Sequence, residues 1–432
     1  MFINIRMHLL YVALMLLVGP FFAQKASNIN NLSTSKTDTQ LIAGLLRSHP
    51  KLFEKVLNNP AEYKVQVIYT QINRDSNNVP SFKEYTYGSL GQFFYPASLV
   101  KLPCSILALE KINSLEEYRV NKETTLFTDS AFTCQKRVVG DSTALNKMPS
   151  VANYIRRMLL VSDNESYNRI YEFLGQEYLN ERLADGSFNR VQVTSRFDMN
   201  CGPEENRYTN PITFLDSAGK VLYKQPMAFN KEFKGISIPG MEVGKGYLDA
   251  KDKYVSGPKS FNGSNYLSLE DATRLLKLIL FPSATYPPNQ FNLSPSDYLF
   301  LKQYMSEYPR ESGHPGYAEK KFPDSFKKYF MYGGDEKARI VVDTMRIFNV
   351  VGQSYGFLSA CAYVVDFKNK IEFMLSAVIY VNKDGIINDN RYEYKEVGFP
   401  FLLNLSRCIY TYEKGRQPVH TPILDEFRLH YK

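Results

Sequence analysis

A serine and a lysine three residues apart are the strongest candidates for covalent chemistry in this chain. Ser98 and Lys101 stand where the aromatic residues 93–95 meet an apolar stretch with helical spacing. Residues i and i+3 share one face of a helix, so the lysine amine can lie beside the serine hydroxyl. A serine hydroxyl is a poor nucleophile until a neighbouring base takes its proton. The pair predicts nucleophilic catalysis, although S-x-x-K alone is a short pattern that chance also produces.

A second motif, Ser162-Asp163-Asn164, follows further along the chain between two predicted helices, residues 151–160 and 166–174. Serine and aspartate are favoured helix caps, and capping alone would explain them. However, S-x-x-K followed by S-D-N is the signature of penicillin-recognising serine enzymes. Taken together, the two motifs favour the catalytic interpretation.

With these motifs the chain resembles the class A β-lactamases and their penicillin-binding relatives. The resemblance implies that Ser98 is the acylated nucleophile and Lys101 its proton partner. It also implies that Ser162 relays a proton to the leaving nitrogen and that Asn164 binds the side-chain amide of the substrate. Asn168 matches a structural asparagine of the family.

The third family motif, Lys-Thr-Gly on the strand that faces the nucleophile, is altered. The matching stretch is Val350-Val351-Gly352, so valines replace the lysine and the threonine. In the family, that lysine supplies positive charge for the substrate carboxylate and for the Ser162 hydroxyl. A valine supplies neither, and we expect weaker acylation or a different substrate.

The turn after this strand matches the family better. The resemblance implies an oxyanion hole from the backbone N–H groups of Ser98 and Gln353, with Gly352 and Ser354 also binding substrate. Residues 352–356 also read as G-x-S-x-G, the elbow of α/β-hydrolases. That elbow must join a strand to a helix, but residues 357–365 are strand-like, which disfavours a triad centred on Ser354.

The family's deacylating glutamate stands in an E-x-x-x-N pattern that this chain lacks. Glu205, five residues before Asn210, is the candidate that the resemblance offers. An exposed acidic turn explains the same residues equally well. Without a placed glutamate the acyl-enzyme would persist, which is penicillin-binding rather than penicillin-destroying behaviour.

Strand-like segments stand at both ends of the chain and helical segments between them. Residues 65–69 and 82–87 form a predicted hairpin, and residues 357–365 and 371–381 form closing strands before a helix at 396–412. Ser268 and Ser294 are expected to cap two further helices. This order favours a β-lactamase-like α/β (α+β) fold, in which helices flank an antiparallel sheet from both chain ends and an all-helical domain is inserted.

The predicted organisation follows from this order. It comprises a signal peptide at 1–23, a flexible segment at 24–38, a sheet domain from 39–95 and 345–432, and a helical domain at 96–344 with an extended insertion at 211–344.

The N-terminus has the layout of a secretory signal. Arg6 precedes an apolar run at residues 9–22, which is short for a membrane span, and Ala23 stands at its exit. We therefore expect a secreted or periplasmic protein without a stable membrane anchor. Of five cysteines, Cys134 and Cys201 lie in polar, loop-like stretches and are the best candidates for a disulfide.

Composition excludes several classes of partner. The net charge of +8 is dispersed without a basic run, so nucleic acid is not indicated. Neither the histidines nor the cysteines have metal-ligand spacing, and no metal or cofactor is expected. We expect a monomer acting on a small-molecule or peptidoglycan-like substrate. The function indicated is an exported serine hydrolase acting through a Ser98 acyl-enzyme on a β-lactam or related amide. The alternatives are a catalytically impaired relative that binds a ligand or cell-envelope partner, and a cell-wall peptidase-like acyl-enzyme former.

Overall fold

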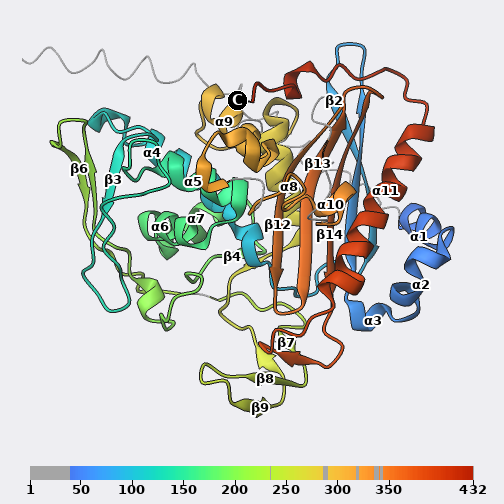
Figure 1. Ribbon diagram of the computed structural model, residues 1–432, viewed down its shortest axis with the longest axis horizontal. Helices are drawn as coiled ribbons and strands as arrows, with labels where there is room; N and C mark the ends of the chain where they lie inside the picture. Colours follow the sequence, from blue (N-terminus) through green and yellow to red (C-terminus); the bar gives the residue numbers. More distant parts are fainter. Residues whose placement is uncertain are drawn as a thin grey trace, which may run out of the picture. The chain divides into compact units, whose positions relative to one another are not determined.

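A five-stranded antiparallel sheet is built from both ends of the chain (Figure 1). The computed structural model describes residues 39–431, except 234, 286–289, 318–320, 335–339 and 341–343. The strand order is β12-β13-β14-β1-β2. The bounds are β1 (Gln66–Arg74), β2 (Pro80–Gly88), β12 (Met345–Ser354), β13 (Phe357–Asp366) and β14 (Ile371–Tyr380). Pairing of β1 with β14 joins the two chain ends, which confirms the predicted fold class.

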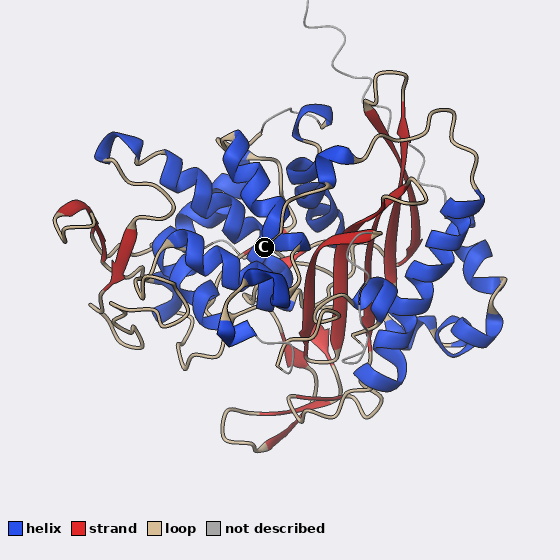
Figure 2. Cartoon of the chain, turned by 45° about the horizontal axis from the view of Figure 1, so that its top comes forward, coloured by secondary structure: helices blue, strands red, loops and turns tan. Residues whose placement is uncertain are grey.

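Helices cover both faces of this sheet (Figure 2). One face packs against helices from the two chain ends, and the other against the helices of the intervening segment (Figure 1). Alternation along a strand sends neighbouring side chains to opposite faces. Val350 therefore lies in the core shared with the intervening helices, while Val351 lies in the opposite core. The covering helices from the chain ends are α1 (Gln40–Arg47), α2 (Pro50–Asn58), α3 (Pro60–Tyr63) and α11 (Phe399–Gly415).

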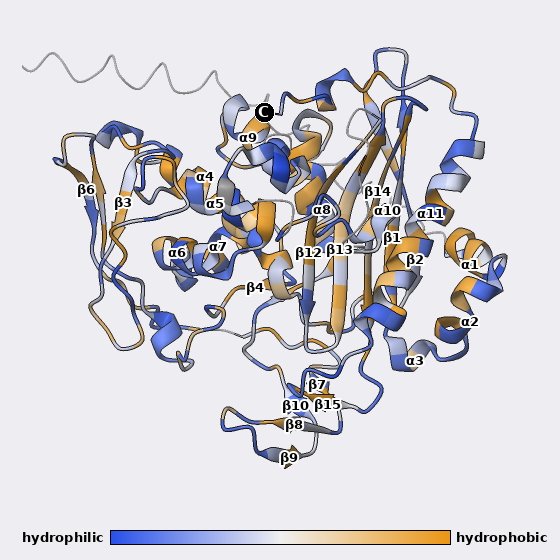
Figure 3. Cartoon of the chain, in the orientation of Figure 1, coloured by the Kyte–Doolittle hydropathy of each residue, from blue (hydrophilic) through white to orange (hydrophobic). Residues whose placement is uncertain are grey.

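The intervening helices surround one central helix, α4 (Lys101–Asn113). Most of its residues are apolar and buried, as expected of a helix that lies inside the protein (Figure 3). The side chains of Ser268 and Ser294 accept backbone N–H groups at the starts of α8 and α9, which confirms both predicted caps. The helices around α4 are α5 (Val151–Val161), α6 (Asn164–Leu174), α7 (Gln176–Asp185), α8 (Leu269–Leu280) and α9 (Pro295–Ser306).

Small sheets accompany these helices, so the intervening segment is not helical throughout. Strands of two to five residues are too short to show a periodic pattern, so the sequence does not predict them. They are β3 (Thr125–Thr128), β4 (Val191–Gln192), β5 (Ile212–Leu215), β6 (Val221–Gln225), β7 (Glu242–Val243), β8 (Gly246–Leu248), β9 (Tyr254–Ser256), β10 (Lys259–Ser260), β11 (Tyr266–Leu267) and β15 (Ile386–Ile387), with the short helix α10 (Tyr329–Tyr332).

A disulfide joins Cys134 to Cys201, which confirms that predicted pair. Cys104, on α4, is a buried thiol. The predicted signal peptide at 1–23 and segment at 24–38 lie outside the described residues. In the part of the chain that the structure describes, no helix has the length and apolar character needed to cross a bilayer.

Candidate active site

Ser98 lies in a 3₁₀ turn, Ala97–Val100, that leads directly into α4. Ala97 has a φ of 46°, a left-handed conformation that is strained for a residue with a side chain. Gly352 on β12 faces this turn closely, since a Cβ there would lie 2.3 Å from the Pro96 carbonyl oxygen. A glycine at 352 therefore lets the sheet edge approach the strained turn that presents Ser98.

Three polar atoms from two helical segments meet at this place. Lys101 Nζ lies 2.9 Å from Ser98 Oγ and 3.2 Å from Ser162 Oγ. Ser162 ends α5 in a left-handed conformation with a φ of 58°, and α6 begins two residues later. This turn between α5 and α6 directs the Ser162 side chain toward Lys101.

The surroundings of Lys101 favour its neutral form. The side chain is fully buried, and its pKa lies well below the ordinary 10.5 because of burial first and repulsion from Lys327 second. Nζ donates to Ser162 O and to Asn164 Oδ1, both at 2.6 Å. A neutral amine has two N–H groups, and both are used there. Its lone pair is then left to accept the Ser98 hydroxyl proton.

Ser98, Lys101, Ser162 and Asn164 form what we call the Ser98 cluster. A loop held by Asn168 closes one side of this cluster. The Asn168 side chain accepts from Phe197 N and donates to Phe197 O, each at 2.8 Å. The next residue, Asp198, accepts a hydrogen bond from Asn164 Nδ2 at 2.6 Å. Asp198 thus contacts the cluster through Asn164, and its φ of 52° marks a sharp turn.

Glu205 lies elsewhere in the same loop. It begins the 3₁₀ turn Glu205–Arg207, and its carboxylate points toward Gly202, because a Cβ added to that glycine would meet Glu205 Oε2 at 2.5 Å. Among the described residues its carboxylate makes no hydrogen bond or ion pair with the Ser98 cluster. Asp198, which belongs to none of the sequence motifs, is a carboxylate that the structure brings to the Ser98 cluster. Its position depends on the Asn168 clamp, which has no local sequence signal.

The end of β12 supplies the opposite wall. Gln353 is exposed, and its Oε1 accepts from Tyr329 OH at 3.3 Å. Ser354 pairs with Phe357 across the two-residue turn Tyr355-Gly356, where both φ angles are positive. The G-x-S-x-G stretch is therefore a β-hairpin, as expected, and not a strand-to-helix elbow.

Two buried lysines, Lys327 and Lys328, lie along the outer edge of β12. No motif in the sequence indicates either of them. Val350 is buried and brings no charge to the strand. Lys327 Nζ donates to Leu159 O at 2.7 Å, and burial lowers the pKa of Lys327 to about 7. Lys328 Nζ donates to Met305 O, Ile347 O and Asn349 Oδ1. A short Lys-Lys pair in an irregular segment has no pattern that points to an active site.

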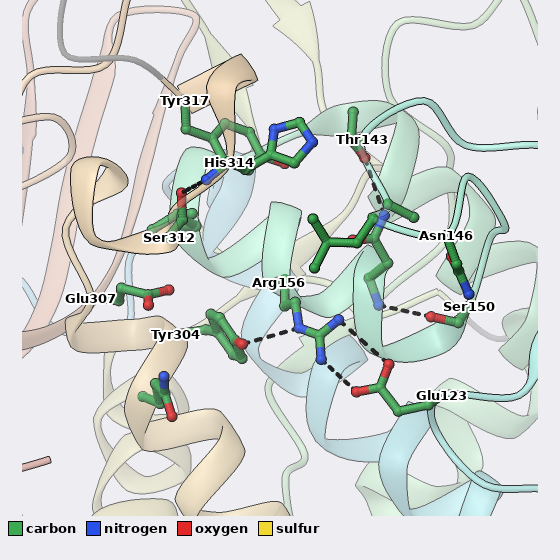
Figure 4. Close-up of a pocket in the computed structure, with 15 residues that line it drawn as sticks. Glu123, Thr143, Asn146, Ser150, Arg156, Tyr304, Glu307, Ser312, His314 and Tyr317 are labelled. Carbon is green, nitrogen blue, oxygen red and sulfur yellow. Dashed lines mark hydrogen bonds and ion pairs between the residues drawn. The ribbon is translucent and has the colours of Figure 1, made fainter. Parts of the chain in front are cut away.

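A separate cavity of about 390 Å³ lies beside α5, between that helix, α9 and residues 307–317 (Figure 4). Arg156 in its wall is paired with Glu123 and Tyr304. Glu307 is 4% exposed, and its Oε2 has no hydrogen-bond partner among the described residues. Burial, then repulsion from Glu311, raises the pKa of Glu307 to about 7.

We expect Glu307→Gln to stabilise the protein at pH 8 and to have little effect at pH 4. The pKa is raised in the folded state, so ionising Glu307 opposes folding only as the pH rises above its unfolded value of about 4.5. The full effect, at most about 3 kcal/mol, is reached above pH 7. Thermal unfolding at the two pH values measures it, with the exposed Glu204→Gln as control. An equal change at both pH values would contradict the assignment.

Comparison with known proteins relates this chain to one family. Residues 53–393 match the model of the family Beta-lactamase2, described as a beta-lactamase enzyme family. A solved β-lactamase from Sphaerobacter thermophilus DSM 20745 is 10% identical with a TM-score of 0.45, covering 87% of this chain and 98% of its own. A β-lactamase from Burkholderia phymatum is 13% identical with a TM-score of 0.45, covering 85% and 98%. A mutant of PBP-A, solved as an acyl-enzyme complex with penicillin G, is 15% identical with a TM-score of 0.43, covering 86% and 96%. No curated protein matches the chain.

Proposed function

Because the chain belongs to the beta-lactamase enzyme family, we propose that it is a serine hydrolase whose Ser98 is acylated by a β-lactam or a related amide. The observation that supports this most directly is the meeting of Lys101 Nζ with Ser98 Oγ and Ser162 Oγ within 3.2 Å. A nucleophile, its base and a second hydroxyl are the parts that amide acylation requires.

The proposed reaction begins at Ser98. Neutral Lys101 takes the hydroxyl proton while Oγ bonds to the substrate carbonyl carbon, and the oxyanion is stabilised by the backbone N–H groups of Ser98 and Gln353. The carbon–nitrogen bond then breaks. The leaving nitrogen takes a proton from the Ser162 hydroxyl, which recovers one from the Lys101 ammonium. The product is an ester on Ser98.

Substrate binding engages Asn164 in this scheme. Its Oδ1 accepts from Lys101 and its Nδ2 donates to Asp198. A substrate side-chain amide that accepts from Nδ2 competes with Asp198 and releases that carboxylate. Gly352, Gln353 and Ser354 form the opposite wall, where an extended substrate can lie along the edge of β12.

A second candidate function is an acyl-enzyme former that releases its product slowly, as a cell-wall peptidase-like protein or a ligand-binding relative would. The observation that favours it is the position of Glu205, whose carboxylate lies outside the cluster. Asp198, which is bound to Asn164, is a carboxylate near the cluster that could activate water instead. The lifetime of the ester on Ser98 distinguishes the two functions.

The test is intact-protein mass spectrometry of the full chain after mixing with benzylpenicillin, with Ser98→Ala as control and nitrocefin turnover measured in parallel. A Ser98 adduct with turnover supports the β-lactamase function. A lasting adduct without turnover supports the second candidate. No adduct and no turnover in the wild type would overturn both as lactam-reactive functions.

We also propose that the protein works outside the reducing cytoplasm as a monomer. The disulfide between Cys134 and Cys201 supports an oxidising compartment, in line with the signal-like residues 1–23. Ser98, Lys101, Ser162 and Asn164 meet within one chain, as a monomeric enzyme requires.

A further inference from the structure

A buried ammonium lies next to the helix that ends at Ser162. Lys327 Nζ donates to the carbonyl oxygen of Leu159, three residues before Ser162. Leu159 is in the last turn of α5, where carbonyl groups lack helical partners and the helix dipole favours positive charge. The end of α5 therefore attracts a cation to the neighbourhood of the catalytic hydroxyls.

The backbone of Lys327 is fastened to β12 beside the altered motif. Asn349 Nδ2 donates to Lys327 O at 2.7 Å, and Asn349 immediately precedes Val350 in the strand. The lysine thus starts from the sheet edge next to Val350 and reaches across to α5. A lysine at position 350, on β12 itself, would extend from this same edge of the sheet.

The two adjacent lysines differ in how far their donors are satisfied. Lys328 Nζ makes three hydrogen bonds, all to protein oxygens, so it has no N–H left for a ligand even when it is charged. Within the described part of the chain, Lys327 Nζ makes one, to Leu159. Two of its N–H groups are therefore available to an anionic ligand, whereas Lys328 has a structural role.

The charge of Lys327 also acts on Lys101. Its charge is the second cause, after burial, of the lowered pKa of Lys101. Two amines that repel one another favour a state in which one is neutral and the other charged. Lys101, which already donates to two carbonyl oxygens, suits the neutral role, and Lys327 at the end of α5 suits the charged one.

Resting on the function proposed above, we propose that Lys327 supplies the positive charge that β12 lacks at Val350 and binds the carboxylate of the substrate. The substrate class is then a β-lactam or peptide with a carboxylate close to the bond that Ser98 attacks. A different segment of the chain thereby delivers to the site the charge that the altered motif has lost.

The ionisation of Lys327 gives this role a pH signature. Burial lowers its pKa to about 7, so the free protein holds the charge below that pH and loses it above. Binding of a carboxylate to the charged form should therefore weaken about tenfold per pH unit above pH 7. A substrate whose carboxylate is esterified should lack this dependence.

The experiment measures the second-order rate constant of Ser98 acylation by benzylpenicillin and by its methyl ester. We expect Lys327→Ala to reduce acylation by the acid about 10²–10³-fold and by the ester no more than a few-fold. Lys327→Arg should keep most of the rate with the acid and abolish the decline above pH 7. Adding Val350→Lys to Lys327→Ala should restore acylation by the acid.

Lys328→Met is the matched control, since this neighbour is equally buried and has a structural role. It should change the rates with acid and ester by the same factor, and circular dichroism and thermal unfolding verify that each variant is folded. Equal losses with acid and ester for Lys327→Ala, or no loss at all, would overturn the role of Lys327 while leaving Ser98 acylation intact. If neither compound acylates the wild type, the proposed function itself fails.

Discussion

Replacing Lys101 with methionine is expected to slow the acylation of Ser98 by about 10³–10⁴-fold, because the serine loses its base. Lys101 Nζ is 2.9 Å from Ser98 Oγ and the side chain is fully buried. Methionine keeps the apolar packing of the lysine stem, so the main loss is the amine. The measurement is the rate of adduct formation with benzylpenicillin, by stopped-flow or quenched-flow mass spectrometry.

The same helix offers a matched control for this variant. Lys111 on α4 is partly buried, donates to Phe173 O at 2.7 Å, and has a pKa lowered by burial to about 8. Lys111→Met should leave the acylation rate within a few-fold of the wild type. If Lys101→Met acylates within tenfold of the wild type, Lys101 is not the base.

The pH profile gives a second check on Lys101. The base must be neutral, and its pKa lies well below 10.5. Acylation by an esterified substrate, which has no carboxylate for Lys327 to bind, should therefore persist at pH values where an ordinary lysine is fully protonated. It should decline only at lower pH, where Lys101 takes up a proton.

Glu172→Ala is expected to lower the free energy of unfolding by about 3–5 kcal/mol, because it removes the buried carboxylate that two buried guanidinium groups share. Glu172 on α6 lies between Arg169 and Arg196, and the side chains of all three are 0% exposed. Loss of the shared carboxylate leaves positive charges that repel one another away from water.

This cluster also supports the active-site loop. Arg196 donates to Tyr208 O at 3.0 Å and to Asn210 Oδ1 at 3.1 Å, and it immediately precedes Phe197 and Asp198 in the chain. We therefore expect Glu172→Ala to loosen the loop that contacts Asn164, in addition to destabilising the fold.

Urea unfolding measures the change for Glu172→Ala, and Glu165→Ala is the control. Glu165 is on the same helix and its carboxylate approaches Arg169 at 3.6 Å, but its side chain is 45% exposed. An exposed pair of this kind contributes less than about 1 kcal/mol. Equal losses for the two variants would show that the buried cluster does not stabilise the fold as described.

Several features of the site follow from short stretches of sequence alone. The three-residue spacing of Ser98 and Lys101 brings their side chains together wherever the chain is helical. Ser162-Asp163-Asn164 separates two helices, because Asp163 caps the second of them. The long strands and the caps of α8 and α9 have equally local signals, because alternation and capping involve residues only a few positions apart. The fold class and the contact between Ser98 and Lys101 could therefore be predicted.

Only the tertiary structure decided which charges surround that pair. Lys327 bonds to Leu159 across 168 positions of sequence, and Asp198 reaches Asn164 only because Asn168 clamps the intervening loop. The same packing leaves Glu205 outside the cluster. Contacts of this kind depend on how separate segments pack, and no spacing within a segment encodes them. The sequence by itself thus determined that Ser98 and Lys101 lie side by side and that Ser162 ends a helix. The folded chain decided that a buried lysine from another segment, Lys327, lies at the end of α5, because helix-end carbonyls accept hydrogen bonds from an ammonium.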